Sequence, residues 1–313
     1  ERSRGRFMEL LRLPRRQALE RVGYLLRQPF YALALPPWLP RVLGGGTATR
    51  EPAALVPDSW PGNAAVGQEI AAGRSPLLGP LLNEPQPPFR PLGADERWIR
   101  ALNGFGWLRH LRAAGGDQAR RAARDLVALW IERESRWSST AWEPATLGER
   151  LGSWLGHWEF YGVSAEVGFR QRLLASIARQ ARHLSSVLPA GLTGAALIQA
   201  IKGLTYAGAA CAEGGPWLRR ATQLLARELP RQVLPDGGQV ERAPATQLAV
   251  LRDLIDLRAA LHAAGAAKVG EPPPALADAI EQMAPALRLL QHGDGGLALF
   301  NGGDEGDPVT VDL

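Results

Sequence analysis

The sequence predicts a mainly α-helical fold, an incomplete α/α toroid of antiparallel helical hairpins that follows an irregular, proline-rich N-terminal arm. From residue 95 to residue 291, apolar residues recur at i, i+3, i+4 and i+7. Short turn-rich segments separate these stretches, which favours antiparallel neighbours. Many of the 25 prolines lie instead between residues 36 and 91, where no helical period is sustained. An open solenoid of helical hairpins is the alternative, because periodicity alone does not show closure.

The first 31 residues are rich in arginine and carry apolar residues at helical spacing on both sides of Pro14. An amphipathic helix of this kind lies either on a membrane surface or against its own domain. We favour packing against the domain, because Pro14 interrupts the apolar stripe and the chain runs directly into sequence typical of a folded protein.

The proline-rich stretch reads as an extended arm with turns, one short helix over residues 64–72 and a segment near residues 77–82 that could pair as a strand. We therefore divide the chain into an N-terminal helix and arm (1–93), a helical domain (94–305) and the start of a linker (306–313). No apolar stretch reaches the roughly 20 residues that span a bilayer.

The apolar period predicts eight helices, each bounded by turn residues. They cover approximately residues 95–114, 117–135, 145–161, 165–188, 194–211, 215–232, 244–264 and 275–291. Two Asp-Gly-Gly turns, at Asp236 and Asp294, are separated by one hairpin repeat, so both can lie on one rim of the domain.

The formal net charge is +5, and Lys202 and Lys268 are the only lysines among the basic residues. A basic balance suits nucleic acid, anionic membranes and acidic polysaccharides alike, and arginine-rich composition is also common in proteins from GC-rich genomes. The single cysteine, Cys211, excludes an intrachain disulfide and lies in an apolar run, as expected of a small core residue.

Residues 231–244 read RQVLPDGGQVERAP, a polar loop between two apolar-periodic segments. This stretch resembles the "rQ-lpDGg-xxErsPxYh" motif of the heparinase II/III family of bacterial polysaccharide lyases, where it lines the sugar cleft. Residues 291–301 resemble the family's "hpDG-iplfNd" segment. Weaker matches lie at residues 102–108 and 149–154, and all four occur in the family's order. The resemblance implies an α/α toroid followed by a second, β-rich domain of the same polypeptide.

The family's chemistry is β-elimination at a uronic acid, in which a group neutralises the carboxylate, a base removes the proton at C5 and an acid protonates the leaving oxygen. An Asn-His pair and a tyrosine supply much of this from the helical domain. The matching positions here are Ala195, Ala196 and Thr246, with Gln247 at a further family histidine. Alanine cannot hydrogen-bond a carboxylate, and threonine lacks the acidity of tyrosine.

Other polar and aromatic residues near the matched motifs are candidates for substrate binding, by charge pairing, hydrogen bonding or stacking on a sugar ring. Each of them could instead have a structural role. They are Asn103, Arg150, Gln199, Lys202, Gln239, Glu241, Arg242, Trp137, Trp142 and His292. Trp154 and Trp158 are four residues apart, which is core spacing.

The resemblance implies a heparinase II/III-like polysaccharide lyase whose usual Asn, His and Tyr positions are replaced. The alternative is a non-catalytic protein of the same fold that binds acidic glycan or acts as a scaffold. A glycoside hydrolase would need paired carboxylates, which only Asp236, Glu241 and Asp294 could supply on this rim. We expect an acidic polysaccharide partner rather than nucleic acid, no cofactor, no metal site because metal-ligand spacing is absent, and a location in the cell envelope or periplasm.

Overall fold

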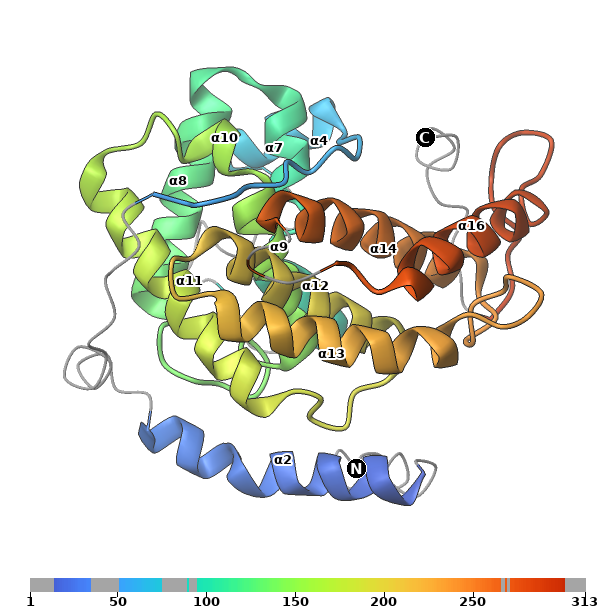
Figure 1. The fold of residues 1–313 in the computed structure, drawn as a ribbon. Coiled ribbons are helices and arrows are strands. Elements are labelled where there is room, and N and C mark those ends of the chain that lie inside the picture. Colours follow the sequence, from blue (N-terminus) through green and yellow to red (C-terminus); the bar gives the residue numbers. More distant parts are fainter. Residues whose placement is uncertain are drawn as a thin grey trace.

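The structure is a computed structural model that describes residues 14–34, 51–74, 89, 95–265, 268 and 271–301. Its regular elements are helices (Figure 1). The β pairing among the described residues consists of two isolated bridges. The mainly α-helical class is therefore confirmed. The helices are α2 (Arg15–Ala34), α4 (Ala64–Ala71), α6 (Glu96–Gly104), α7 (Leu108–Ala114), α8 (Gly116–Arg133), α9 (Pro144–Gly156), α10 (Trp158–Tyr161), α11 (Val167–Val187), α12 (Gly194–Ala210), α13 (Gly215–Gln232), α14 (Pro244–Ala264) and α16 (Pro274–Arg288).

Helix α12 lies at the centre of the bundle and packs against α9, α11, α13 and α14 (Figure 1). Its backbone touches that of α9, because a Cβ atom on Gly203 would lie 2.1 Å from the carbonyl oxygen of Gly148. Glycine at both positions is what allows this close crossing. The antiparallel hairpins around α12 form the incomplete toroid that the sequence predicts.

Two predicted helices are each broken in two, which corrects their expected extents. The helix expected over 95–114 is interrupted at Phe105, whose φ of 63° is left-handed. The helix expected over 145–161 is interrupted at His157, whose φ is −107° and whose Nδ1 lies 2.8 Å from the carbonyl oxygen of Ser153. The apolar period of the sequence continues through both breaks, so it does not reveal them.

The core contains the large side chains that the helical spacing places inside. Trp130, Trp154 and Trp158 are buried and pack among the helices. The ring centroids of Trp130 and Trp154 lie 5.3 Å apart in a T-shaped arrangement, a favourable geometry for aromatic pairs. Cys211 is fully buried, as expected.

The arm runs along the ends of the central helices. The backbone N–H of Ala53 donates to the carbonyl of Ala210 at 2.8 Å, and that of Asp58 donates to Gly156 at 2.8 Å. These bonds satisfy carbonyl groups at the C-terminal ends of α12 and α9. Helix α4 confirms the short helix expected over 64–72. The strand expected near 77–82, the linker at 306–313 and the boundary between residues 93 and 94 lie outside the described residues.

Helix α2 packs against the domain through one face. Tyr24 is buried against Val187 and Ala190, and the ring of Tyr31 lies 4.9 Å from that of His183. Packing of the N-terminal helix against its own domain is therefore confirmed. Within the part of the chain that the structure describes, no helix combines the length and apolar character needed to cross a bilayer.

Both Asp-Gly-Gly turns have the same local structure. Asp236 accepts from the N–H of Gly238, and Asp294 accepts from that of Gly296, each at 3.0 Å. An isolated bridge closes each turn, and the second residue of each has a positive φ that suits glycine. The Asn301 side chain that follows the second turn donates to the carbonyl of Arg242 at 2.7 Å, so the two segments meet on one side of the domain.

Candidate functional site

A polar pocket of about 150 Å³ lies where α9, α12 and α14 meet the arm and the turn between α6 and α7. Its lining residues are Asp58, Gly106, Arg109, Glu149, Gly152, Ser153, Gln199, Lys202, Tyr206, Ala249, Arg252, Asp253 and Asp256. Ionisable groups dominate this list, which distinguishes the pocket from the apolar interior around it.

One face of α12, which begins at Ala195, contributes three residues to the pocket. Ala195, Gln199, Lys202 and Tyr206 follow one another at spacings of four, three and four residues, so they share one side of the helix. The last three line the pocket. The first is the residue that the motif match assigns to the family's asparagine.

Helix α14 repeats this arrangement. Thr246, Ala249, Asp253 and Asp256 share one face at spacings of three, four and three residues, and the last three line the pocket. Thr246 is the residue that the motif match assigns to the family's tyrosine. The two helices pack against each other, and both faces contribute residues to the pocket. The pocket together with Ala195 and Thr246, each one helical turn from a lining residue, is called the α12–α14 groove below.

Lys202 is the central cation of the pocket. Its Nζ donates to Asp253 Oδ1 at 2.6 Å and to Asp256 Oδ2 at 2.9 Å. Burial alone would lower the pKa of Lys202, but the two carboxylates raise it above its usual value. Burial raises the pKa of Asp256, and Lys202 offsets this only in part. Lys202 therefore stays charged and holds two aspartates together.

Asp58 anchors the arm to the pocket through a second group of ions. Its Oδ2 accepts from Arg109 at 2.9 Å, and its Oδ1 accepts from the backbone N–H of Trp60 at 3.0 Å. Burial by itself would raise the pKa of Asp58, but Arg109, followed by His157, holds it below its usual value. The guanidinium of Arg252 lies 4.6 Å from the ring centroid of Trp60, within cation–π range.

Glu149 differs from the other carboxyl groups in the pocket because it has no hydrogen-bond or ion-pair partner among the described residues. Its carboxylate rests on the turn between α6 and α7, where a Cβ atom at Gly104 would lie 2.1 Å from Oε2 and one at Gly106 would lie 2.8 Å from Oε1. Burial, followed by the negative charge of Asp253, raises the pKa of Glu149 to about 7. A carboxyl group with this pKa can take up or release a proton near neutral pH.

This pKa predicts how stability depends on pH. Because Glu149 binds its proton more tightly in the folded chain, its effect is a loss of stability as pH rises from about 4.5 to about 7. We expect Glu149→Gln to stabilise the chain at pH 8 by on the order of 1–3 kcal/mol relative to the parent, and to have little effect at pH 4. Urea unfolding of both proteins at the two pH values measures this. A difference in the free energy of unfolding between variant and parent that is the same at pH 4 and pH 8 would contradict the raised pKa of Glu149.

The loop after α13 meets the start of α12, as the motif order predicts. Glu241 accepts a hydrogen bond from the backbone N–H of Ala195 at 3.0 Å, so its carboxylate occupies the N-terminal end of α12, where negative charge is favourable. Gln239 is fully buried and donates to Gln232 Oε1 at 3.0 Å. Arg242 pairs with Asp236 at 2.6 Å on the surface.

The order of the family motifs predicts that Gln199, Lys202, Gln239, Glu241 and Arg242 converge on one cleft, and this prediction is only partly correct. Gln199 and Lys202 line the pocket, whereas Gln239, Glu241 and Arg242 hold the neighbouring loop in place. The physical reason is that each of these three has partners within the loop or at the helix end beside it. Gln247, at a family histidine position, is also buried and donates to the carbonyls of Gly237 and Met283.

Three other candidate binding residues lie in the core, which corrects their expected place on the rim. Asn103 is fully buried, donates to the carbonyls of Phe89 and Ile99 and accepts from Trp130. Arg150 is fully buried and donates to Asn103, Ala141 and Gln180. Trp142 is fully buried and donates to the carbonyl of Glu134.

The two remaining candidates lie away from the lining of the pocket. Trp137 is partly buried, and its ring lies 6.3 Å from that of Tyr31 on α2. His292 is exposed at the second Asp-Gly-Gly turn, where its N–H donates to the carbonyl of Gly296. A binding role for His292 stays a prediction.

The most unusual group of the pocket, Glu149, was missed because the sequence does not show that the Gly104–Gly106 turn packs over it. The spacing along α12 and α14 could have identified Tyr206, Asp253 and Asp256 as neighbours of Lys202. No helical spacing could have identified Asp58, because it lies in the arm, where the apolar residues do not recur at a helical period. Among the described residues, no three His, Cys, Asp or Glu side chains are placed to hold a metal ion.

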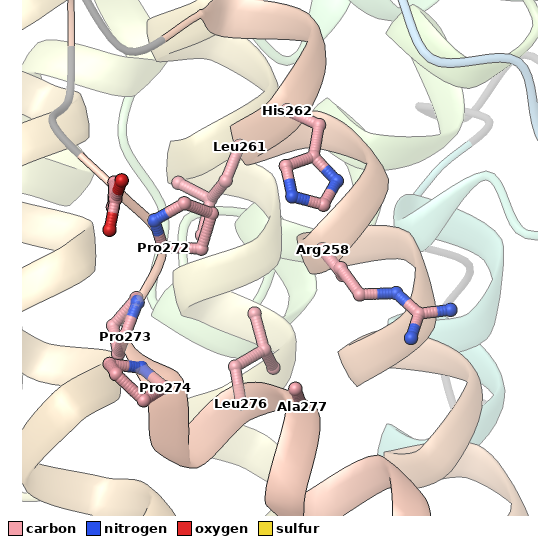
Figure 2. A pocket seen from close by; sticks show the side chains of 9 residues that line it. Arg258, Leu261, His262, Pro272, Pro273, Pro274, Leu276 and Ala277 are labelled. Carbon is pink, nitrogen blue, oxygen red and sulfur yellow. The ribbon is translucent and has the colours of Figure 1, made fainter.

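A second, more apolar cavity of about 420 Å³ lies between the end of α14 and the start of α16. Figure 2 shows Arg258, Leu261 and His262 on one side and the three prolines before α16 on the other. No residue at a matched catalytic position lines it.

A family model described as "Heparinase II/III N-terminus" matches residues 114–308. The chain belongs to the heparinase II/III family. A solved heparinase III has a similar fold, with a TM-score of 0.62 and 15% identity over 75% of this chain and 41% of that one. Heparan sulfate lyase HepC from Pedobacter heparinus gives a TM-score of 0.52 and 18% identity over 90% of this chain and 44% of that one.

Among curated proteins, FtsZ-localized protein C of Caulobacter vibrioides is 31% identical over 258 residues. The match covers 81% of this chain and 43% of that protein. This heparinase II/III family chain therefore spans less than half the length of the relatives that it matches. The solved structures, all below a fifth in identity, establish the fold of the helical domain.

Proposed function

We propose that this chain is a heparinase II/III-like protein that binds polysaccharide along the groove between α12 and α14, without β-elimination through the family's usual residues. The observation that carries the proposal is the pair of helix faces described above. Ala195 and Thr246, which the motif match assigns to the family's catalytic positions, lie one helical turn from the lining residues Gln199 and Ala249. A sugar chain that follows the family's cleft would pass both the replaced positions and the pocket.

The replaced positions favour binding over cleavage. Ala195 and Ala196 have no side-chain group that bonds a carboxylate or moves a proton, and the Thr246 hydroxyl does not ionise in the range of a tyrosine. The backbone N–H of Ala195 is already used by Glu241. Ala195, Ala196 and Thr246 therefore do not supply the group that neutralises a uronate or the groups that transfer protons in the family's reaction.

The charges of the pocket favour a weakly charged sugar over a sulfated one. Its lining includes four acidic and three basic side chains. Lys202 and Arg109 are paired with aspartates, and Arg252 stacks on Trp60. A sulfate group would have to compete with these partners for the cations, and the neighbouring carboxylates would repel it. Within the acidic polysaccharides, an unsulfated uronic acid polymer is the better fit.

The proposal predicts that the purified chain binds alginate at least as tightly as heparin and releases no unsaturated uronate from either. Ala249 is exposed in the groove, so Ala249→Trp should fill it and weaken alginate binding by roughly tenfold or more, since the indole displaces about one sugar ring. Calorimetric titration gives the affinity, and uronate absorbance gives the reaction.

Ala259→Trp is the matched control, because Ala259 is also exposed on α14 but does not line the pocket. Alginate affinity should be the same in this variant as in the parent. If neither polymer binds, or if the two tryptophan variants bind alginate equally, the groove is not a polysaccharide site.

A second candidate function, favoured by the pKa of Glu149, is β-elimination with Glu149 as the base. Its carboxyl group is unpaired among the described residues, and burial places its pKa at about 7. The C5 proton of a uronate would pass to the Glu149 carboxylate, the double bond between C4 and C5 would form, and the bond from C4 to the leaving oxygen would break as that oxygen takes a proton from water. Unsaturated uronate that increases with pH through about 7, and that Glu149→Gln abolishes while Thr246→Ala does not, would establish this function in place of the first.

The location in the cell envelope or periplasm and the β-rich C-terminal domain are parts of the same proposal. They rest on the family to which the chain belongs.

A further inference from the structure

Helix α2 has two faces, and only one of them is used by the domain. Tyr24 and Tyr31 pack inward, and a Cβ atom on Gly191 would lie 2.7 Å from the backbone nitrogen of Arg21, so the helix backbone touches the loop after α11. In Figure 1, α2 lies along one side of the bundle, below α11 and α13. The opposite face is directed away from the helices it packs on.

That outer face is apolar. Leu19, Val22, Leu26 and Phe30 follow at spacings of three, four and four residues and so form one row. Leu19 is 73%, Leu26 70% and Phe30 68% exposed, with Val22 at 39%. Single exposed apolar side chains are ordinary, but a row of four along one helix is characteristic of a surface that something else covers.

Basic side chains border this row. Helix α2 contains four arginines and one acidic residue. Arg16 and Glu20 form an exposed pair at 3.3 Å, whereas Arg15 and Arg27 have no ion-pair partner among residues whose placement is described. Arginines beside an apolar row suit a partner that is apolar within and negatively charged at its surface.

We infer that the outer face of α2 is a membrane-binding surface that inserts Leu19, Leu26 and Phe30 among the acyl chains of an anionic phospholipid bilayer. The arginines at its edges contact the headgroups. The helix lies in the plane of the interface and does not span the bilayer, because its four arginines and one glutamate would have to enter the acyl region. This surface places the groove of the helical domain close to a membrane.

The size of the row favours a bilayer over a second protein chain. A stable protein interface buries roughly 800 Å² on each partner. Four side chains on one helix offer less, and the neighbouring arginines would have to be paired or left buried in such an interface. A bilayer requires no matching surface, and its phosphates supply the negative charge.

The test uses the whole chain with vesicles of phosphatidylglycerol and phosphatidylcholine, and with vesicles of phosphatidylcholine alone. We expect cosedimentation with the anionic vesicles, weaker binding to the neutral ones, and loss of binding as salt rises. Leu26→Glu should reduce partitioning by roughly tenfold or more, because the carboxylate would have to enter the acyl region. Val167→Glu, at an exposed valine on α11, should bind like the parent.

A label at α2 makes the test independent of sedimentation. The only native cysteine, Cys211, is fully buried, so a thiol introduced by Leu26→Cys can be labelled selectively with a polarity-sensitive dye. Its emission should shift to the blue with anionic vesicles, while the same dye on Val167→Cys should not respond. Absence of binding to anionic vesicles, or equal loss in Leu26→Glu and Val167→Glu, would overturn the inference, as would light scattering that shows a dimer sensitive to Leu26→Glu but no vesicle binding.

Discussion

Replacement of Arg150 by alanine is expected to destabilise the fold by roughly 4 kcal/mol or more. The guanidinium is fully buried and donates to the carbonyls of Asn103 and Ala141 and to Gln180 Oε1, each at 2.8 Å. It also lies 4.0 Å from the ring centroid of Trp130. Each acceptor left without a donor costs about 1–3 kcal/mol, and the empty volume adds to this.

The measurement is the free energy of unfolding in urea, with Arg100→Ala as the control. Arg100 is exposed on α6 and pairs with Glu96 at 3.6 Å, so its loss should cost less than about 1 kcal/mol. Arg150→Ala would then unfold at a far lower urea concentration than Arg100→Ala. If the two variants were equally stable and only Arg150→Ala lost polysaccharide affinity, Arg150 would belong to the binding site after all.

Arg150 also shows why some of the site could not be predicted from the sequence. A charged side chain within a family motif is expected at the surface, because arginine is rarely buried without partners. Its partners come from three distant segments, at Asn103, Ala141 and Gln180. No spacing in the sequence brings these together. The same limit applies to Asn103 and Trp142, which sequence reasoning made candidates for substrate binding.

The helices themselves were predictable because burial of one face imposes a period on the residues. That period gave the extents of α11 to α14 to within a few residues. It failed at Phe105, where a left-handed residue breaks the helix without a change in apolar pattern. The pocket depends on that break, since Glu149 rests on the turn that it creates.

Lys202 is the central cation of the pocket, and its replacement by methionine is expected to destabilise the chain by about 3–5 kcal/mol at pH 7. The Lys202 side chain is 15% exposed and is bonded to Asp253 and Asp256. Removal of the ammonium leaves two neighbouring carboxylates without a counterion. Their repulsion should raise the pKa of at least one of them above its unfolded value, so the variant loses stability as pH rises and recovers as pH falls.

In the parent chain the raised pKa of Lys202 keeps its stabilising charge at both pH 4 and pH 7, and the pH dependence that Glu149 contributes is common to both proteins, so it cancels in their difference. In urea unfolding, the difference in the free energy of unfolding between the parent and Lys202→Met should therefore be smaller at pH 4 than at pH 7. Arg242→Ala removes one partner of an exposed pair, with side chains 51% and 59% exposed, and should change stability by less than about 1 kcal/mol. A Lys202→Met variant that matched Arg242→Ala at pH 7 would mean that the two aspartates of the pocket do not depend on Lys202.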